Sequence, residues 1–135
     1  MRPLFVDTAA WMAMADESDP LHRAALRVRD RHLEESGLLV TTDYVMDETL
    51  TLIRVRIGLD AVGAFWEQTS ASPRLRWERI DTRRFQAAVE WFFRWKDKSF
   101  SFTDCTSFVV MRELHLKKAL TCDRHFRDAG FEILP

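Results

Sequence analysis

The hydrophobic positions of this chain form short apolar runs separated by longer stretches with helical spacing. Two continuous apolar runs, "LFVD" at residues 4–7 and "LLVTT" at 38–42, have the length and character of buried strands. The segment "RLRWERI" alternates between apolar and polar positions, as a strand does. The segments "KALTCD" and "FEILP" supply two further strands near the end of the chain. The pattern therefore predicts four to five strands.

Helical spacing and capping residues occupy the intervals between these strands. Pro20 follows polar residues at the start of one periodic stretch, and Gly37 follows its end. Thr42 or Asp43 is placed to cap the next long helix, and Thr82 opens a later one. The predicted helices cover residues 8–15, 20–36, 43–57, 59–71, 82–95 and 103–115, and residues 124–130 are expected to form a turn.

Strands that alternate with helices imply a parallel sheet with helices on both faces, because parallel strands need crossover connections. We therefore predict a single three-layer α/β/α domain over residues 1–135, with a central, mostly parallel sheet of four to five strands. The carboxyl ends of parallel strands meet at one edge of the sheet, and function in such folds lies at that edge.

Several apolar side chains bear on packing and on possible partner surfaces. Phe92 and Trp95 match the core spacing of their predicted helix, whereas Trp91 falls on the opposite, exposed side. A second group has two interpretations that the sequence leaves open, a hydrophobic groove for a partner or part of the core. It comprises Trp11, Met12, Met14, Leu21 and Leu26.

The composition is that of a soluble globular protein, with 47% hydrophobic and 30% charged residues and no apolar run of the roughly 20 residues that span a membrane. We expect a cytoplasmic protein. Cys105 and Cys122 lack metal or redox spacing and are predicted to be reduced core thiols. The net charge is −1, but sixteen of the twenty basic residues are Arg, which suits bidentate contacts to phosphate, so nucleic acid is not excluded.

Four acidic residues stand where strand ends would come together, namely Asp7, Glu48, Asp104 and Asp123. Two like charges about 4 Å apart repel by roughly 4 kcal/mol near a protein surface, so such a cluster calls for a cation. Taken singly, three of them have simpler explanations as a helix cap, a favourable dipole partner and a turn former. Glu48 falls between the apolar positions Val45, Leu52 and Val55, where a carboxylate needs a partner.

Other catalytic signals are absent from the sequence. The four histidines include no pair at metal-ligand spacing such as HExxH, which favours solvated or packed side chains. The chain has no GxGxxG, GxxxxGKS/T or GxSxG motif, which removes the dinucleotide, P-loop and serine hydrolase classes.

Read as a pattern, the acids and their surroundings give a family resemblance. The segments "FVDTAAW", "TTDYVMDETLTL", "SFTDCTSFVVMREL" and "TCDRHFRDAGF" resemble PIN-domain ribonucleases, in particular the VapC toxins of bacterial toxin–antitoxin pairs, over the whole chain. The third segment is the most specific. By this resemblance, the metal-binding acids are Asp7, Glu48, Asp104 and Asp123, with Thr8 and Thr103 as hydroxyl support. Asp43 departs from the usual uncharged residue, and is expected to be a cap or an outer carboxylate.

The resemblance implies an endoribonuclease that uses Mg²⁺ or Mn²⁺, the hard ions that oxygen ligands prefer, and that leaves 5′-phosphate products. Arg124, His125 and Arg127 are candidates for contacts to RNA phosphates, with a solvated turn as the alternative. A cognate VapB-type antitoxin and a homodimer are also implied. The alternatives are a catalytically silent binding module, a housekeeping RNA-processing nuclease, or a phosphatase that uses Asp7 covalently, which the missing second Asp of a DxD motif disfavours.

Overall fold

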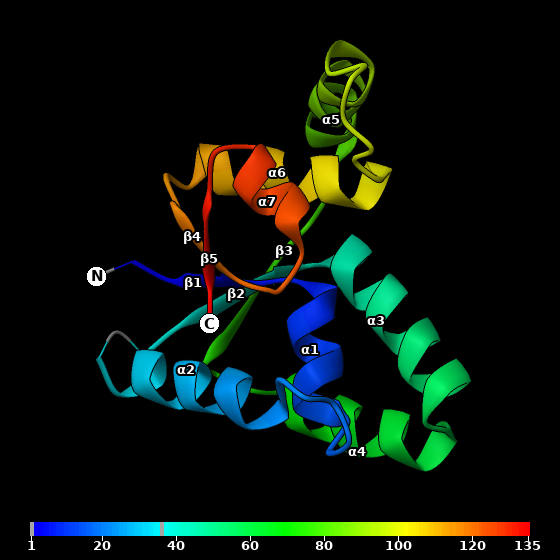
Figure 1. Ribbon diagram of the computed structural model, residues 1–135, viewed down its shortest axis with the longest axis vertical. Helices are drawn as coiled ribbons and strands as arrows, with labels where there is room; N and C mark the ends of the chain where they lie inside the picture. Colours follow the sequence, from blue (N-terminus) through cyan, green and yellow to red (C-terminus); the bar gives the residue numbers. More distant parts are fainter. Residues whose placement is uncertain (1, 36) are drawn as a thin grey trace.

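The computed structural model describes residues 2–35 and 37–135 (Figure 1). Its strands are β1 (Leu4–Val6), β2 (Leu39–Thr42), β3 (Leu75–Glu78), β4 (Lys118–Leu120) and β5 (Glu132–Leu134). Its helices are α1 (Thr8–Ala15), α2 (His22–Glu35), α3 (Asp43–Arg56), α4 (Leu59–Thr69), α5 (Thr82–Arg94), α6 (Phe102–Glu113) and α7 (Arg124–Asp128). The order along the chain follows the predicted alternation.

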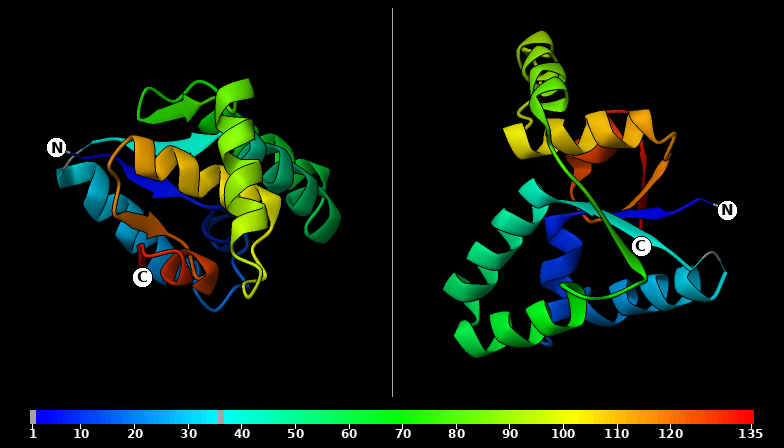
Figure 2. Two further views of the ribbon diagram at one scale, coloured as in Figure 1. Left: turned by 90° about the horizontal axis from the view of Figure 1, so that it is seen from above. Right: turned by 180° about the vertical axis from the view of Figure 1, so that it is seen from behind.

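The five strands form one parallel sheet in the order β3-β2-β1-β4-β5. Helices α1, α2 and α4 lie on one side of this sheet, and α5 and α6 lie on the other (Figures 1 and 2). The three-layer α/β fold predicted from the sequence is therefore confirmed, with every strand pair parallel. The chain leaves β1 toward β2 on one side and later returns to β4 on the other, so the order of strands reverses at β1.

This reversal places the functional edge of the sheet. Asp7 follows β1 directly, and Asp123 lies three residues beyond the end of β4. In open parallel sheets the crevice outside the carboxyl ends of the strands, at the point where the order reverses, is where ligands bind. The fold thus brings residues from the two ends of the chain to one place.

Helix α6 is the central core helix. Every residue from Asp104 to Met111 is buried, because this helix lies between the sheet and α5. Phe108 makes ring contacts with Trp91, Phe100 and Phe126 at centroid distances of 5.0 to 5.4 Å. This packing fixes the position of the first turn of α6, which carries Asp104.

The prediction of which side of α5 is buried was wrong. Ala88 and Trp91 are buried, whereas Phe92 and Trp95 are 41% and 44% exposed. The helix packs mainly against α6, so only a narrow stripe is covered, and the ring of Phe92 contacts Phe102 in the first turn of α6. Aromatic spacing in the sequence did not reveal which face meets the neighbouring helix.

Other packing predictions also need correction. Residues 124–128 form the short helix α7 rather than a turn. Cys122 is exposed, while Cys105 is buried as expected. Val55 is 75% exposed, so the apolar stripe beside Glu48 does not reach that far. Trp11 and Met12 are core residues, which decides their part of the open question in favour of packing. No helix in the described parts of the chain is both long and apolar enough to cross a membrane.

Candidate functional site

Asp7 is the most buried carboxylate of the site. It ends β1 and precedes α1, yet its side chain makes no capping hydrogen bond to that helix, so the simple cap explanation fails. Its Oδ2 accepts a hydrogen bond of 2.9 Å from the hydroxyl of Thr121. Burial, with repulsion from Asp104 as the next cause, raises the pKa of Asp7 to about 7. A carboxylate in this position favours a nearby positive charge.

Asp104 is held at the start of α6 by a capping box. The hydroxyl of Ser101 accepts from the Asp104 N–H at 3.0 Å, and Asp104 Oδ2 accepts from the Ser101 N–H at 3.1 Å. Burial, as the main cause, raises the pKa of Asp104, and repulsion from Asp123 acts in the same direction. The capping box therefore orients this carboxylate, but leaves its charge without a cationic Lys or Arg partner among the described residues.

His125 contacts two of the acids from the first turn of α7. Its Nδ1 lies 2.9 Å from Asp104 Oδ2 and 3.4 Å from Asp123 Oδ1. Its Nε2 lies 3.2 Å from the hydroxyl of Ser99. In the tautomer with the proton on Nδ1, the ring donates to Asp104 and accepts from Ser99. His125 thus contacts the acids of the site, whereas the sequence suggested a solvated or packed side chain or a contact to RNA phosphates.

Asp123 and Thr121 complete the link between β4 and α7. Asp123 Oδ1 accepts from the His125 N–H at 2.9 Å, so this carboxylate does cap the short helix. The Thr121 hydroxyl oxygen accepts from the Asp123 N–H at 3.0 Å while its proton goes to Asp7. Sequence analysis missed Thr121, although a polar residue at the end of a buried strand and two positions before an acid was the available signal.

These groups form a candidate cation site. One ligand atom from each of Asp104, Asp123 and His125 lies within 4.8 Å of the others. Asp7 is close enough to Asp104 and Asp123 for both to raise its pKa. Two buried carboxylates with no Lys or Arg partner in the described structure, and with raised pKa values, fit a divalent cation, because a cation offsets both the burial and the repulsion that raise these pKa values.

Glu48 lies on α3, the helix that packs against α1. It is half-buried in the second turn of α3 and is not a member of the close three-residue cluster. Thr8 connects α1 to this part of α3, since its hydroxyl contacts the Val45 carbonyl at 3.4 Å and accepts from Thr49 at 3.3 Å. Thr8 thus supports the packing of the two helices beside Glu48.

The remaining predicted residues lie on α3, α6 and α7. The Asp43 carboxylate accepts from the N–H groups of Tyr44 and Ile80, so it fixes the loop after β3. The backbone carbonyl of Thr103 accepts from Thr106 Oγ1 at 2.6 Å. The Thr103 hydroxyl makes no hydrogen bond to another described residue. Arg124 and Arg127 are exposed on α7, next to His125.

Comparison with known proteins identifies the family. The family model of the PIN domain matches residues 4–132. The chain belongs to the PIN-domain family. Among curated proteins, this PIN domain is 33% identical over 133 residues to the 23S rRNA-specific endonuclease VapC20 of Mycobacterium tuberculosis, with 98% of each chain covered. It is 25% identical over 126 residues to Ribonuclease VapC26 of the same organism, covering 91% of this chain and 89% of the relative.

Solved structures agree with this assignment. The crystal structure of Mycobacterium tuberculosis VapC20, described as a Sarcin-Ricin loop cleaving toxin, matches with a TM-score of 0.89 at 33% identity and covers 98% of this PIN domain and 99% of that chain. A DNA-bound VapBC complex from Salmonella typhimurium matches with a TM-score of 0.70 at 12% identity, with 98% and 97% covered, which supports the fold alone. The resemblance to VapC-type PIN-domain nucleases seen in the sequence is confirmed.

Proposed function

We propose that this PIN domain is a metal-dependent endoribonuclease that acts as the toxin of a toxin–antitoxin pair. The observation that carries the proposal is the pair of buried carboxylates Asp7 and Asp104, which lie beside Asp123 and His125 without a Lys or Arg partner in the described structure. The two Mycobacterium tuberculosis relatives, whose names describe ribonucleases, support the choice of RNA as substrate.

Mg²⁺ or Mn²⁺ is the proposed ion. Asp7, Glu48 and Asp104 are the proposed direct ligands, and Asp123 is placed to hold a second ion or to position a water. Carboxylate oxygens in this number suit hard cations that keep part of their water shell. When bound, the ion supplies positive charge at the scissile phosphate and at the attacking water.

The side chains of the site have separate tasks in this proposal. Thr121 and Ser101 orient the carboxylates of Asp7 and Asp104 through hydrogen bonds. His125 orients the carboxylates of Asp104 and Asp123 through its contacts to both side chains. The water attacks phosphorus in line, and hydrolysis leaves a 5′-phosphate and a 3′-hydroxyl, without participation of the RNA 2′-hydroxyl.

RNA would approach along α7. Arg124 and Arg127 are exposed on this helix, and neither has an ion-pair partner among the described residues. Arg side chains contact phosphate oxygens through two parallel N–H groups, which positions a strand without reading its sequence. Neutralising either residue is expected to weaken RNA binding and lessen its salt dependence.

A VapB-type antitoxin and a homodimer are the proposed protein partners. Because Trp11 and Met12 belong to the core, we propose the exposed apolar side chains as the surface for partners. The larger exposed apolar side chains fall in two groups, one on α3, α4 and β3 and the other on α5. The first comprises Val55, Ile57, Leu59, Trp66 and Trp77, and the second comprises Phe85, Phe92, Phe93 and the C-cap residue Trp95.

Cleavage of total RNA tests the proposal. We compare the wild-type protein with Asp104→Asn, each with Mg²⁺, Mn²⁺ or EDTA, and map the product ends. The expected result is metal-dependent cleavage with 5′-phosphate ends that is lost in the variant, while the fold stays intact by circular dichroism. Equal cleavage by both proteins would reject the assigned site. No cleavage by the wild type in the absence of antitoxin would favour a binding module.

A further inference from the structure

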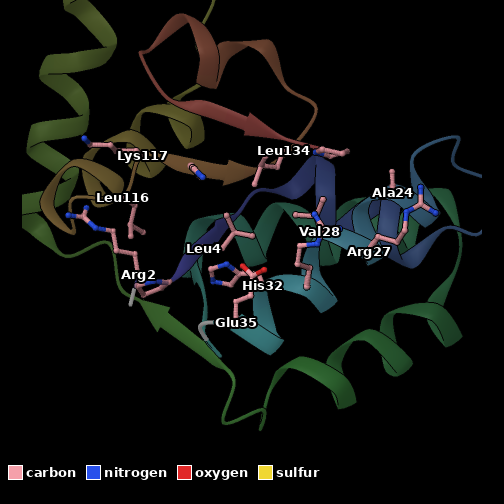
Figure 3. A pocket seen from close by; sticks show the side chains of 14 residues that line it. Arg2, Leu4, Ala24, Arg27, Val28, His32, Glu35, Leu116, Lys117 and Leu134 are labelled. Carbon is pink, nitrogen blue, oxygen red and sulfur yellow. The ribbon is translucent and has the colours of Figure 1, made fainter.

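A separate groove lies between α2 and the sheet, away from the carboxylate cluster. Its volume is about 760 Å³, and it is bounded by α2 on one side and by the starts of β1 and β4 on the other (Figure 3). Leu4, Val28, Leu116 and Leu134 supply an apolar floor. The groove exists because α2 packs closely at Ala25 but its later turns are only partly covered.

The charged side chains around this groove are mostly cationic. Five cationic side chains line it, all of them exposed, and among the described lining residues Glu35 is the only carboxylate side chain. The cations come from α2, from the segment before β1 and from the start of β4. They are Arg2, Arg27, Arg31, Lys117 and Lys118.

Four of these cations lack an ion-pair partner among the described residues. Arg27, Arg31, Lys117 and Lys118 have no ion pair within the described residues, whereas Arg29 on the same helix pairs with Asp30 at 2.8 Å. Arg27 and Arg31 are also four residues apart on one helix, a like-charge spacing that costs a few tenths of a kcal/mol. Arg2 donates to the carbonyl of His115, which anchors its guanidinium at the rim. Such an arrangement favours an external anion.

The groove comes near the proposed active site at the end of β5. Leu134 is one of its lining residues, and the carbonyl of Leu134 accepts from the Thr121 N–H at 2.8 Å. The hydroxyl of the same Thr121 binds Asp7. One end of the groove is therefore a single strand away from the carboxylate cluster. RNA is a polyanion long enough to reach from the cluster to the groove cations, including Lys117 and Lys118 at the amino end of β4, which favours RNA over a small anion.

We propose that this groove binds a segment of the RNA substrate flanking the cleavage site, with Arg27 and Arg31 on one wall and Lys117 and Lys118 on the other contacting its phosphates. The aliphatic floor accommodates ribose and base edges. The inference rests on the proposed ribonuclease function and adds to it a second contact surface for the substrate. Binding here positions the RNA without cleaving it.

Fluorescence anisotropy with a short single-stranded RNA of mixed sequence tests the groove. All proteins carry Asp104→Asn, so that the probe stays intact, and binding is measured with Mg²⁺ between roughly 50 and 200 mM salt. Each phosphate contact contributes about 0.7 to the slope of log K against log salt, so Arg27→Gln/Arg31→Gln should lower the slope by about 1.4. Lys117→Gln/Lys118→Gln should do the same.

A matched control separates this effect from net charge. Arg23→Gln/Arg29→Gln removes two charges from the same helix but outside the groove. Across that salt range, the RNA affinity of the groove variants should fall about 7-fold less than that of the control, since 1.4 in slope corresponds to that factor over a fourfold salt change. Slopes equal to the control in both groove variants would overturn the inference.

Two further readouts keep the alternatives apart. A polyglutamate peptide should compete poorly with the RNA probe, and competition as strong as that of unlabelled RNA would overturn the assignment in favour of an acidic protein segment. In the active background, the groove variants should raise KM and leave kcat within about twofold, because they touch binding alone. Wild-type cleavage with unchanged groove slopes would reject only this inference, whereas reduced slopes without any cleavage would reject the proposed function and retain the groove.

Discussion

The hydroxyl of Thr121 donates a 2.9 Å hydrogen bond to Asp7 and, through its oxygen, accepts the N–H of Asp123 at 3.0 Å. One side chain at the end of β4 therefore joins the carboxylate that follows β1 to the first residue of the α7 segment. The residues it joins are more than a hundred positions apart in the chain. Because Thr121 is buried, its geometry is fixed by the sheet rather than by solvent. This makes it a positioning residue for the proposed metal site.

Replacing Thr121 by Val should weaken the site while preserving its shape. The Asp7 carboxylate loses a charge-assisted hydrogen bond, which is worth about 1.5–3 kcal/mol, and outer contacts of this kind typically change metal affinity by roughly 10-fold to 100-fold. Mg²⁺ affinity measured by calorimetry should fall within that range. Thr121→Ser keeps the hydroxyl and should restore most of it. Equal affinities for the wild type and the Val variant would show that the bond does not position Asp7.

The raised pKa of Asp7 predicts how the stability of the metal-free protein depends on pH. The pKa rises from 3.8 in the unfolded chain to about 7 in the native state, so the native state binds the proton more tightly. The contribution to stability is fully present below pH 3.8, declines above it, and is lost as the pH rises through about 7. Each unit of pKa corresponds to about 1.4 kcal/mol.

Asp7→Asn isolates this contribution. The amide has no proton to lose, so urea unfolding in EDTA should show the variant more stable than the wild type at pH 8, and the difference should shrink toward pH 4. Added Mg²⁺ should stabilise the wild type at pH 8 but not the variant, since binding to the native state alone raises its stability. A variant less stable than the wild type at pH 8 would show that burial and repulsion of the Asp7 carboxylate do not destabilise the native state.

The acids Asp7, Asp104 and Asp123 were predictable from the sequence because each lies beside a strand end or a helix start. The carboxyl ends of parallel strands meet at one edge of the sheet, so local patterns indicated these positions without the strand order. The all-parallel sheet followed from the same alternation. Glu48 remains a proposed ligand, because its place in the second turn of α3 depends on how that helix leans toward β1, which no local pattern encodes.

His125 could not be recognised in the same way. Its partner Asp104 is 21 positions earlier in the chain, and the segment between them reads as helix, strand and turn. Its role depends on α7, a helix of five residues too short to show a periodic pattern. The prediction of which side of α5 is buried failed for a related reason, since Trp91 and Phe92 are adjacent aromatic residues and the contact with α6 decides which one is buried.

His125→Ala should reduce metal-dependent cleavage. Asp104 loses the donor at 2.9 Å, and the cluster loses one of its three close ligand groups. We expect a fall of roughly 10-fold to 100-fold in Mg²⁺ affinity, or in activity at limiting Mg²⁺. His125→Asn, whose amide can still donate, should retain more activity than the Ala variant. His22→Ala serves as a control, since that ring contacts the carbonyl of Ala13 outside the site. Activity of His125→Ala equal to that control would remove His125 from the site.

Arg84 is expected to stabilise the contact between β3, α5 and α6. Its side chain is 12% exposed, pairs with Glu78 at 2.8 Å and Glu113 at 2.9 Å, and donates to the carbonyl of Arg79. Breaking a buried pair can cost 3–5 kcal/mol, but here Glu78 keeps Arg76 at 2.6 Å and Glu113 keeps Arg83 at 2.9 Å.

We therefore expect Arg84→Met to lower the free energy of unfolding by about 2 kcal/mol, less than an unrelieved buried charge would cost. Arg83→Met is the matched control, because the Arg83 side chain is 72% exposed and surface pairs contribute about 0–1 kcal/mol. Urea unfolding of both variants measures the difference. Equal stabilities would show that the network contributes no more than a surface pair.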